Sequence, residues 1–110
     1  LKEASFSGKT WDQQVADICQ ALPQNIYISF DIDGLNPALC PNTGTPVPGG
    51  FELEQISFLL FKLIAAGKKI IGFDLNEVSP GENDDWDANV GARALWTLVC
   101  LTEKNRREYA

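Results

Sequence analysis

Apolar residues recur at helical spacing in three segments of the chain. The first predicted helix covers residues 11–22, where the apolar residues share one face and Pro23 ends the segment. The second covers 51–66, with acidic residues near its positive N-terminal end and Gly67 at the position of a left-handed cap. The third covers 86–103. Its expected apolar face consists of Val90, Ala94, Leu95, Leu98 and Val99.

Two short apolar runs between these helices have the β-branched and aromatic character of buried strands. They cover residues 26–30 and 69–75. The order helix, strand, helix, strand, helix implies a βαβ unit with parallel pairing and a right-handed crossover. The predicted fold class is therefore α/β, a parallel sheet with flanking helices. The Pro- and Gly-rich stretch 34–50 is predicted to be a long loop, and such loops are usually functional.

Composition narrows the possible partners and chemistry. The 110 residues, 45% of them hydrophobic, suffice for one domain or part of one. A net charge of −6 argues against nucleic acid or an anionic membrane surface and favours small cations. The absence of histidine excludes Ser-His-Asp and Cys-His machinery. Three cysteines without a C-x-x-C pair favour reduced thiols and a cytoplasmic protein.

No apolar stretch reaches the roughly 20 residues that a membrane-spanning helix needs. The longest, 56–66, is interrupted by Ser57 and Lys62, so we expect no transmembrane segment. The chain starts without Met and without a basic-then-apolar leader, and it contains no Met elsewhere. We therefore expect that it begins inside a longer gene product.

Both predicted strands end in carboxylates, at the sheet edge where ligands of α/β proteins gather. Asp31 and Asp33 form a D-x-D after the first strand. In an extended chain, residues i and i+2 point to the same side, so two oxygen donors can converge on one cation. The alternative is structural: Asp31 caps a neighbouring element and Asp33 begins a turn.

The second strand is followed by Glu77. This side chain has three candidate roles, as a metal ligand, a general base or a recognition carboxylate for a cationic substrate. A solvated loop carboxylate is an equally open interpretation. Asp74 alternates with Phe73 and Leu75, which favours a residue that supports the ligands of the site, or a salt-bridged core residue, over a catalytic group.

The loop at 43–50 and the isolated side chains allow two interpretations each. Its glycines permit tight turns, or they bring backbone N–H groups and the Thr45 hydroxyl close to a ligand. Cys40 is expected to be a bystander thiol, because the chain offers it no partner base. Three tryptophans are expected to be packing residues: Trp11, Trp86 and Trp96.

Three segments carry a resemblance to a known family. The runs SFDIDGLNP (29–37) and PNTGTPVPGG (41–50) closely resemble the signature of the ureohydrolases, the arginase and agmatinase family. GFDLNEVSP (72–80) is similar to that family's next strand, so the resemblance covers roughly 26–103. It implies an arginase-like three-layer α/β fold with two Mn²⁺ ions and a bridging hydroxide that attacks a guanidinium or formimidoyl carbon. It also implies a small guanidino or formimidoyl substrate and a homo-oligomer.

Carried over by position, the resemblance implies that Asp31 and Asp33 are metal ligands, Glu77 orients the amidino group and Thr45 lines the site. Asn36 departs from the Asp common in the family. The family's other ligands, two histidines and two aspartates, come from earlier strands, and this chain has no histidine. We therefore expect residues 1–110 to be the C-terminal part of a single ureohydrolase domain that is inactive by itself.

Two alternatives remain open from the sequence. An apolar strand followed by D-x-D-G also begins haloacid-dehalogenase-like phosphatases, in which Asp31 would be the nucleophile, Asp33 the acid/base and Mg²⁺ the cofactor. No clear downstream lysine and Gly-Asp-x-x-x-Asp pattern accompanies it. A non-catalytic fold fragment is the other alternative. The choice among agmatinase, arginase and formimidoylglutamase substrates also stays open.

Overall fold

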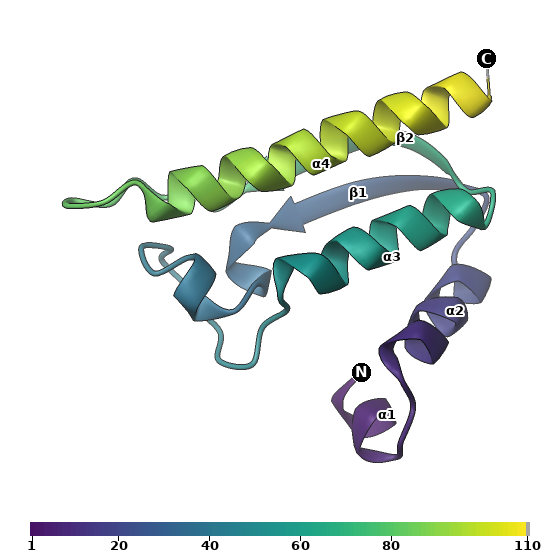
Figure 1. The fold of residues 1–110 in the computed structure, drawn as a ribbon, viewed down its shortest axis with the longest axis horizontal. Coiled ribbons are helices and arrows are strands. Elements are labelled where there is room, and N and C mark those ends of the chain that lie inside the picture. Colours follow the sequence, from purple (N-terminus) through teal and green to yellow (C-terminus); the bar gives the residue numbers. More distant parts are fainter. Residues whose placement is uncertain (110) are drawn as a thin grey trace.

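The computed structural model describes residues 1–109, and its elements follow the predicted alternation (Figure 1). The helices are α1 (Lys2–Phe6), α2 (Trp11–Ala21), α3 (Leu53–Ala65) and α4 (Trp86–Glu108), and the strands are β1 (Asn25–Asp31) and β2 (Lys69–Asn76). Helix α1 was not predicted, because five residues without a side-chain N-cap are too short to show a period. None of the helices described over 1–109 is long and apolar enough to cross a bilayer.

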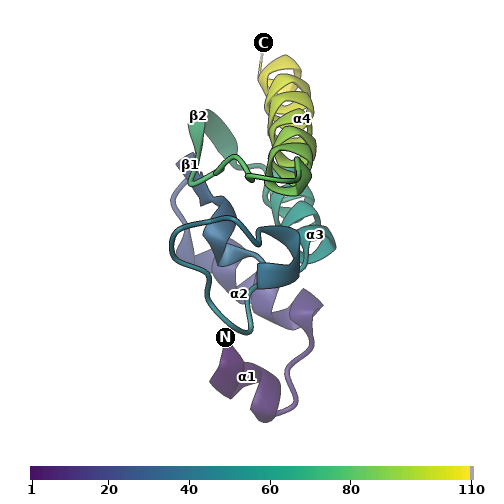
Figure 2. The same ribbon diagram turned by 90° about the vertical axis from the view of Figure 1, so that its left-hand side faces the viewer.

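The two strands pair in parallel, which confirms the predicted βαβ pairing. The register runs from Asn25 opposite Lys69 to Asp31 opposite Asn76, with an irregularity after Ile26. Helices α3 and α4 lie on one side of the strands (Figure 2). The opposite side of the sheet is exposed at Tyr27. The described residues therefore cover the sheet on one face only.

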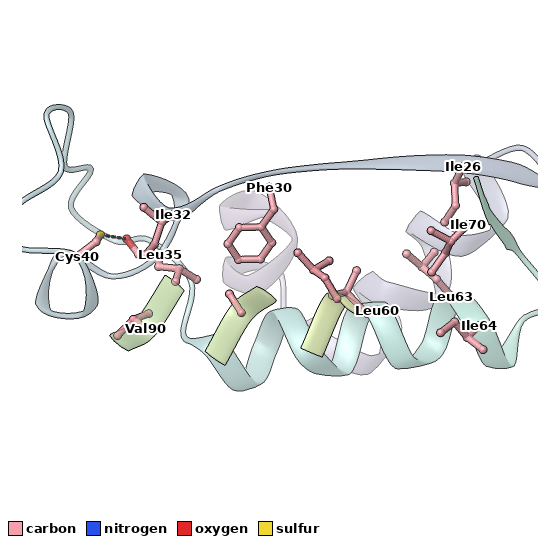
Figure 3. Packing of buried hydrophobic residues seen from close by; sticks show 12 residues of the cluster. Ile26, Phe30, Ile32, Leu35, Cys40, Leu60, Leu63, Ile64, Ile70 and Val90 are labelled. Carbon is pink, nitrogen blue, oxygen red and sulfur yellow. Dashed lines mark hydrogen bonds between the residues drawn. The ribbon is translucent and has the colours of Figure 1, made fainter. Parts of the chain in front are cut away.

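The hydrophobic core lies between that face and the two helices (Figure 3). It joins residues from β1, β2, α3 and α4, among them Ile26, Phe30, Leu60, Leu63, Ile64, Ile70, Val90, Ala94 and Leu98. The α4 contribution is a narrow stripe with a spacing of four residues. Leu95 and Val99 lie one position beyond this stripe and are exposed, so their expected place on the buried face is wrong.

Helix boundaries differ from the prediction where side chains or pairing decide them. Helix α3 begins at Leu53 rather than 51, because Phe51 forms a parallel bridge with Leu35 and the Glu52 backbone N–H donates to Gln55 Oε1 at 2.9 Å. Gly67 has φ +83°, as expected of a left-handed cap. Helix α4 ends at Glu108, five residues beyond the predicted end at 103. The prediction stopped early because the last turns of this helix are polar and show no apolar period.

The tryptophans do not behave alike. Trp11 packs against Phe51 with ring centroids 5.6 Å apart, as expected. Trp86 is exposed, although its Nε1 donates to the Ala38 carbonyl oxygen at 3.2 Å. Trp96 is 72% exposed, so its predicted packing role is wrong for the described residues.

Candidate functional site at the carboxyl edge of the sheet

Parallel pairing brings the two candidate loops to the same edge of the sheet. Asp31 ends β1 and pairs with Asn76, which ends β2. The D-x-D segment therefore leaves the sheet beside the segment that begins with Glu77. The candidate residues Asp31, Asp33 and Glu77 all lie at the edge where α/β proteins bind their ligands.

The D-x-D segment bends between its two aspartates. Asp31 is the last strand residue, whereas Asp33 lies in a 3₁₀ turn over Ile32–Gly34. The expected extended conformation is therefore wrong, because the fully buried Ile32 pulls the chain into the core. Asp31 stays exposed and Asp33 is half-buried. The Thr45 hydroxyl donates to Asp33 Oδ2 at 2.5 Å, so Thr45 does lie against a candidate ligand.

The long loop closes on its own start and thereby carries Thr45 to Asp33. Phe51 N–H donates to the Gly34 carbonyl at 3.0 Å, and Asn36 N–H donates to the Phe51 carbonyl at 2.8 Å. A Cβ on Gly50 would lie 2.3 Å from the Leu35 carbonyl oxygen. For Gly50, close backbone approach is therefore the reason for glycine, rather than contact with a ligand.

Two further loop residues have structural roles. Asn36 donates from Nδ2 to Glu52 Oε1 at 2.7 Å and accepts from the Ala38 N–H at 3.0 Å. An aspartate cannot make the first of these bonds, which explains the amide at this position. Burial, followed by the charges of Asp87 and Asp33, raises the pKa of the Cys40 thiol. The thiol stays protonated, in agreement with a bystander role.

Asp74 is used by the sheet itself. Its Oδ1 accepts hydrogen bonds from Ser29 Oγ at 2.9 Å and from the Asn76 side-chain amide. A hydrogen bond to Asp74, then burial and the Asp74 charge, raises the pKa of the Tyr27 phenol. No salt bridge to Asp74 occurs within residues 1–109. The salt-bridged role expected for Asp74 is therefore wrong for the described residues, and its hydrogen bonds go to Ser29 and Asn76 rather than to a candidate ligand.

Glu77 has an unusual backbone. Its φ of +69° makes it the one non-glycine residue with positive φ in the described part of the chain. Such a conformation costs a residue with a Cβ about 1–2 kcal/mol and concentrates at functional sites. The Glu77 carbonyl accepts from the Thr43 hydroxyl at 3.2 Å. The exposed Glu77 carboxylate has no hydrogen-bond donor among the residues that the structure describes.

A buried carboxylate joins the two loops. Asp87 is fully buried in the first turn of α4. It accepts from the Asn42 backbone N–H at 3.1 and 3.2 Å and from Asn42 Nδ2 at 2.9 Å. The same amide also donates to Asp84 Oδ1 at 2.9 Å. These bonds and the positive end of α4 offset the cost of burying the charge.

Sequence reasoning missed Thr43, Asn42 and Asp87. An aspartate in the first turn of a helix is common, and nothing in the local pattern marks this one as buried. The left-handed Glu77 was equally invisible, because glutamate has no preference for that conformation. Asn42 and Thr43 lie inside the run PNTGTPVPGG (41–50), but that pattern does not show which of its side chains make contacts with other loops.

Asp31 and Asp33 fit a hard divalent cation. Carboxylate oxygens are the ligands that Mn²⁺ and Mg²⁺ prefer. Asp31 has no hydrogen-bond donor within the described range, and Thr45 occupies one oxygen of Asp33. No cluster of three or more His, Cys, Asp or Glu side chains forms among residues 1–109. The described residues thus offer two candidate carboxylates, Asp31 and Asp33, at this edge.

Comparison with known proteins identifies the family. The sequence model of the arginase family matches residues 3–100. The chain belongs to the arginase family. It is 39% identical over 79 residues to the N(1)-aminopropylagmatine ureohydrolase of Thermus thermophilus, covering 72% of this chain and 26% of that protein. It is 42% identical over 89 residues to the agmatinase of Proteus mirabilis, covering 80% and 28%.

Solved structures agree with this assignment. A hypothetical agmatinase from Burkholderia thailandensis matches with a TM-score of 0.77 and 31% identity, over 94% of this chain and 33% of that one. The proclavaminate amidino hydrolase of Streptomyces clavuligerus matches with a TM-score of 0.71 and 30% identity, over 92% and 34%. This arginase-family chain thus spans 26% to 34% of the proteins named here. The predicted family and fold class are confirmed, and the phosphatase alternative is wrong.

Proposed function

We propose that residues 1–110 form the C-terminal part of a single ureohydrolase domain that cleaves a C–N bond of a small guanidino or formimidoyl substrate. One observation carries this proposal. Two carboxylates with no described hydrogen-bond donor, Asp31 and Glu77, lie on adjacent loops at the ligand-binding edge of an arginase-family sheet. Exposed carboxylates without an intramolecular donor have both oxygens open to a ligand, and this is the edge where ligands of α/β proteins bind.

Asp31 and Asp33 are assigned as two ligands of a two-Mn²⁺ centre, which supplies an acidified water when it is bound. Thr45 keeps Asp33 in one orientation, because its hydroxyl occupies Oδ2 and leaves Oδ1 free. The charge of Asp31 is equally available, because no described side chain neutralises it. The remaining ligands, including the histidines that the resemblance implies, would come from strands outside this chain.

Glu77 is assigned to the substrate. A planar amidinium group and a carboxylate form two parallel charge-assisted hydrogen bonds, roughly twice as strong as neutral ones. This pairing would hold the electrophilic carbon in a fixed direction relative to the acidified water. The net charge of −6 also favours approach of a cationic substrate.

The decisive experiment separates substrate recognition from metal binding. Glu77→Gln, made in the protein as expressed from its own gene, should lower kcat/KM by about 100-fold. Manganese content measured by atomic absorption should stay near the wild-type level. Glu82→Gln is the matched control, because Glu82 is an exposed carboxylate in the following loop. Metal loss in parallel with activity would place Glu77 among the ligands, and unchanged kinetics would make it a solvated loop carboxylate.

The 110-residue chain by itself is expected to be inactive and to bind Mn²⁺ poorly. Two carboxylates compete weakly with water for a divalent ion. Calorimetric titration of the isolated chain with Mn²⁺ tests this expectation. Submicromolar affinity with two ions per chain would contradict it, and so would amidino hydrolase activity of the isolated chain.

The cellular setting follows from composition and resemblance together. We propose a cytoplasmic homo-oligomer whose partner is a small molecule, without nucleic-acid or membrane binding. The thiols without a C-x-x-C pair support the cytoplasmic location, and the acidic composition supports the absence of nucleic-acid and membrane binding. Native mass spectrometry of the expressed protein tests the oligomer.

A further inference from the structure

Two contacts hold the backbone around Glu77, one at its carbonyl and one at the following residue. The Thr43 side chain is 6% exposed and donates from its hydroxyl to the Glu77 carbonyl oxygen at 3.2 Å. The next residue, Val78, packs against Gly91 so closely that a Cβ on Gly91 would lie 3.0 Å from Val78 Cγ2. A left-handed glutamate persists only when its surroundings hold it there. These two contacts supply that restraint.

Both contacts depend on the first turns of α4. Asp87 fixes Asn42, the residue before Thr43, through the backbone N–H and the side-chain amide. Gly91 follows Asp87 by four residues, so both lie on the same face of the helix. One helix face therefore sets the position of Thr43 and of Val78. It connects the loop after β1 to the loop after β2.

We propose that Thr43, held in place by Asn42 and Asp87, is a positioning residue that directs the Glu77 carboxylate toward the substrate. The inference deepens the proposed function and rests on it. Without the Thr43 hydroxyl, Glu77 loses one of the contacts that oppose its relaxation to a negative φ. Such relaxation turns its Cα–Cβ bond and moves the carboxylate away from the amidino group. Asp31 and Asp33 stay where they are, because Ile32 and Thr45 hold their segment.

Thr43→Val in the protein as expressed tests this role, because valine keeps the shape and removes the hydroxyl. We expect kcat/KM to fall on the order of tenfold, the size expected for one lost hydrogen bond. The loss should appear in kcat as well as in KM, since orientation is needed for the chemical step. Manganese content should stay near wild type. Thr43→Ser, which restores the hydroxyl, should recover most of the activity.

Thr97→Val is the matched control. Thr97 also donates from its hydroxyl to a backbone carbonyl, that of Arg93 at 3.1 Å, but it does so within α4 and away from the sheet edge. Its substitution removes the same kind of bond without touching Glu77. Wild-type kinetics are expected for Thr97→Val. A loss equal to that of Thr43→Val would show a general effect of stability and overturn the inference.

A double-mutant cycle with Glu77→Gln distinguishes positioning from an independent effect. If Thr43 acts through Glu77, the combined variant should be no slower than Glu77→Gln alone. Additive losses overturn the inference. Unchanged kinetics in Glu77→Gln mean that the proposed function itself fails. Slow turnover in Glu77→Gln with normal turnover in Thr43→Val means that only the present inference fails.

Gly91→Ala provides a second test that remains available should Thr43→Val not fold. Alanine is favoured over glycine inside a helix, so α4 is not weakened. The new methyl group would lie 3.0 Å from Val78 Cγ2, so Val78 must give by a few tenths of an ångström, and we expect this shift to reach the backbone of its neighbour Glu77. We expect a severalfold fall in kcat/KM with unchanged manganese content. Should Thr43→Val not fold, wild-type kinetics in Gly91→Ala would show that the Glu77 backbone needs no restraint from this helix face, which overturns the inference.

Discussion

The two edges of the parallel sheet use polar side chains in opposite ways. At the amino edge, the buried Asn105 accepts from the Ile70 N–H at 2.8 Å and donates to the Lys68 carbonyl at 2.7 Å. Gln24 donates to the Gly67 carbonyl at 2.6 Å. These amides complete the hydrogen bonding of the strand ends. Both are neutral amides, so neither side chain offers a carboxylate to a cation.

At the carboxyl edge, the carboxylates divide into two groups. Asp74 and Asp87 accept several hydrogen bonds and serve the fold. Asp31 and Glu77 accept none from the residues that the structure describes, and Glu77 also carries an unfavourable backbone angle. A protein gains nothing in stability from a free carboxylate on a strained backbone. Asp33 lies between the two groups, because it accepts one hydrogen bond from Thr45 and keeps Oδ1 free. The comparison therefore separates Asp74 and Asp87, which serve the fold, from carboxylates with oxygens left for a ligand.

The largest effect is expected for the proposed metal ligands. Asp31→Asn or Asp33→Asn, in the protein as expressed, should lower kcat/KM by more than about 100-fold, because even substitutions outside the ligand set cost 10- to 100-fold. Manganese content should fall with activity. Elemental analysis alongside kinetics measures both. Asp12→Asn, at an exposed position of α2, is the control.

Asp31→Asn also tests the contrast between the amino and carboxyl edges of the sheet. Asp31→Asn breaks no described hydrogen bond, so the metal-free protein should keep its free energy of unfolding. Full metal occupancy and wild-type turnover in both variants would show that these aspartates are not ligands. A large loss of stability in metal-free Asp31→Asn would show that the carboxylate serves the fold.

The next effect concerns the amino edge and appears in stability alone. Asn105→Ala leaves the Ile70 N–H and the Lys68 carbonyl without their partner, so the free energy of unfolding should fall by about 2–3 kcal/mol. Urea unfolding measures it, with the exposed Asn89→Ala as control. Below the unfolding transition kcat/KM should be unchanged. Lost turnover in a fully folded Asn105→Ala protein would break the contrast between the two edges.

A smaller effect is expected at Gln24, which has the same amide chemistry at the same edge but is exposed. Water replaces the lost partner there, so Gln24→Ala should cost about 0.5–1 kcal/mol. The same urea titration compares it with Asn105→Ala. An equal loss in both variants would mean that burial does not set the cost at this edge.

The smallest effect is expected at Glu103. Hydrogen bonds first from Arg106 and then from Arg107 lower the pKa of Glu103 from 4.5 to about 2. A lowered pKa in the folded state means that the contribution is present above pH 4.5 and is lost as the pH falls toward 2. All three side chains are exposed at the surface, so salt should screen the effect.

Thermal unfolding of Glu103→Gln across pH tests this ion-pair network. The variant should melt slightly below the wild type at pH 6 in low salt, and the two should converge near pH 2. The difference in melting temperature should also shrink in 1 M NaCl, because the Debye length is then about 3 Å and the exposed charges are screened. A difference that persists at pH 2 would mean that the carboxylate charge is not its source.

Local patterns predicted the elements of this fold well. The apolar period placed α2, α3 and the start of α4 to within about two residues, and β-branched runs placed both strands. The left-handed cap at Gly67 was predicted correctly, because this role requires only a backbone conformation that glycine adopts easily. The end of α4 was missed because its polar last turns have no apolar face, and Leu95, Trp96 and Val99 were misplaced because the buried stripe is narrower than their pattern suggests.

The sequence by itself determined the α/β alternation and the residue types at the strand ends. Tertiary structure alone decided that Asp33 leaves the strand, that Asp87 holds Asn42 and that Thr43 holds a left-handed Glu77. The bonds that do so join residues 34 and 45 positions apart. A periodic pattern describes neighbours within a few residues, because it reflects which face of one element is buried. Contacts between two loops depend on how parallel strands align them, and that is set only when the chain folds.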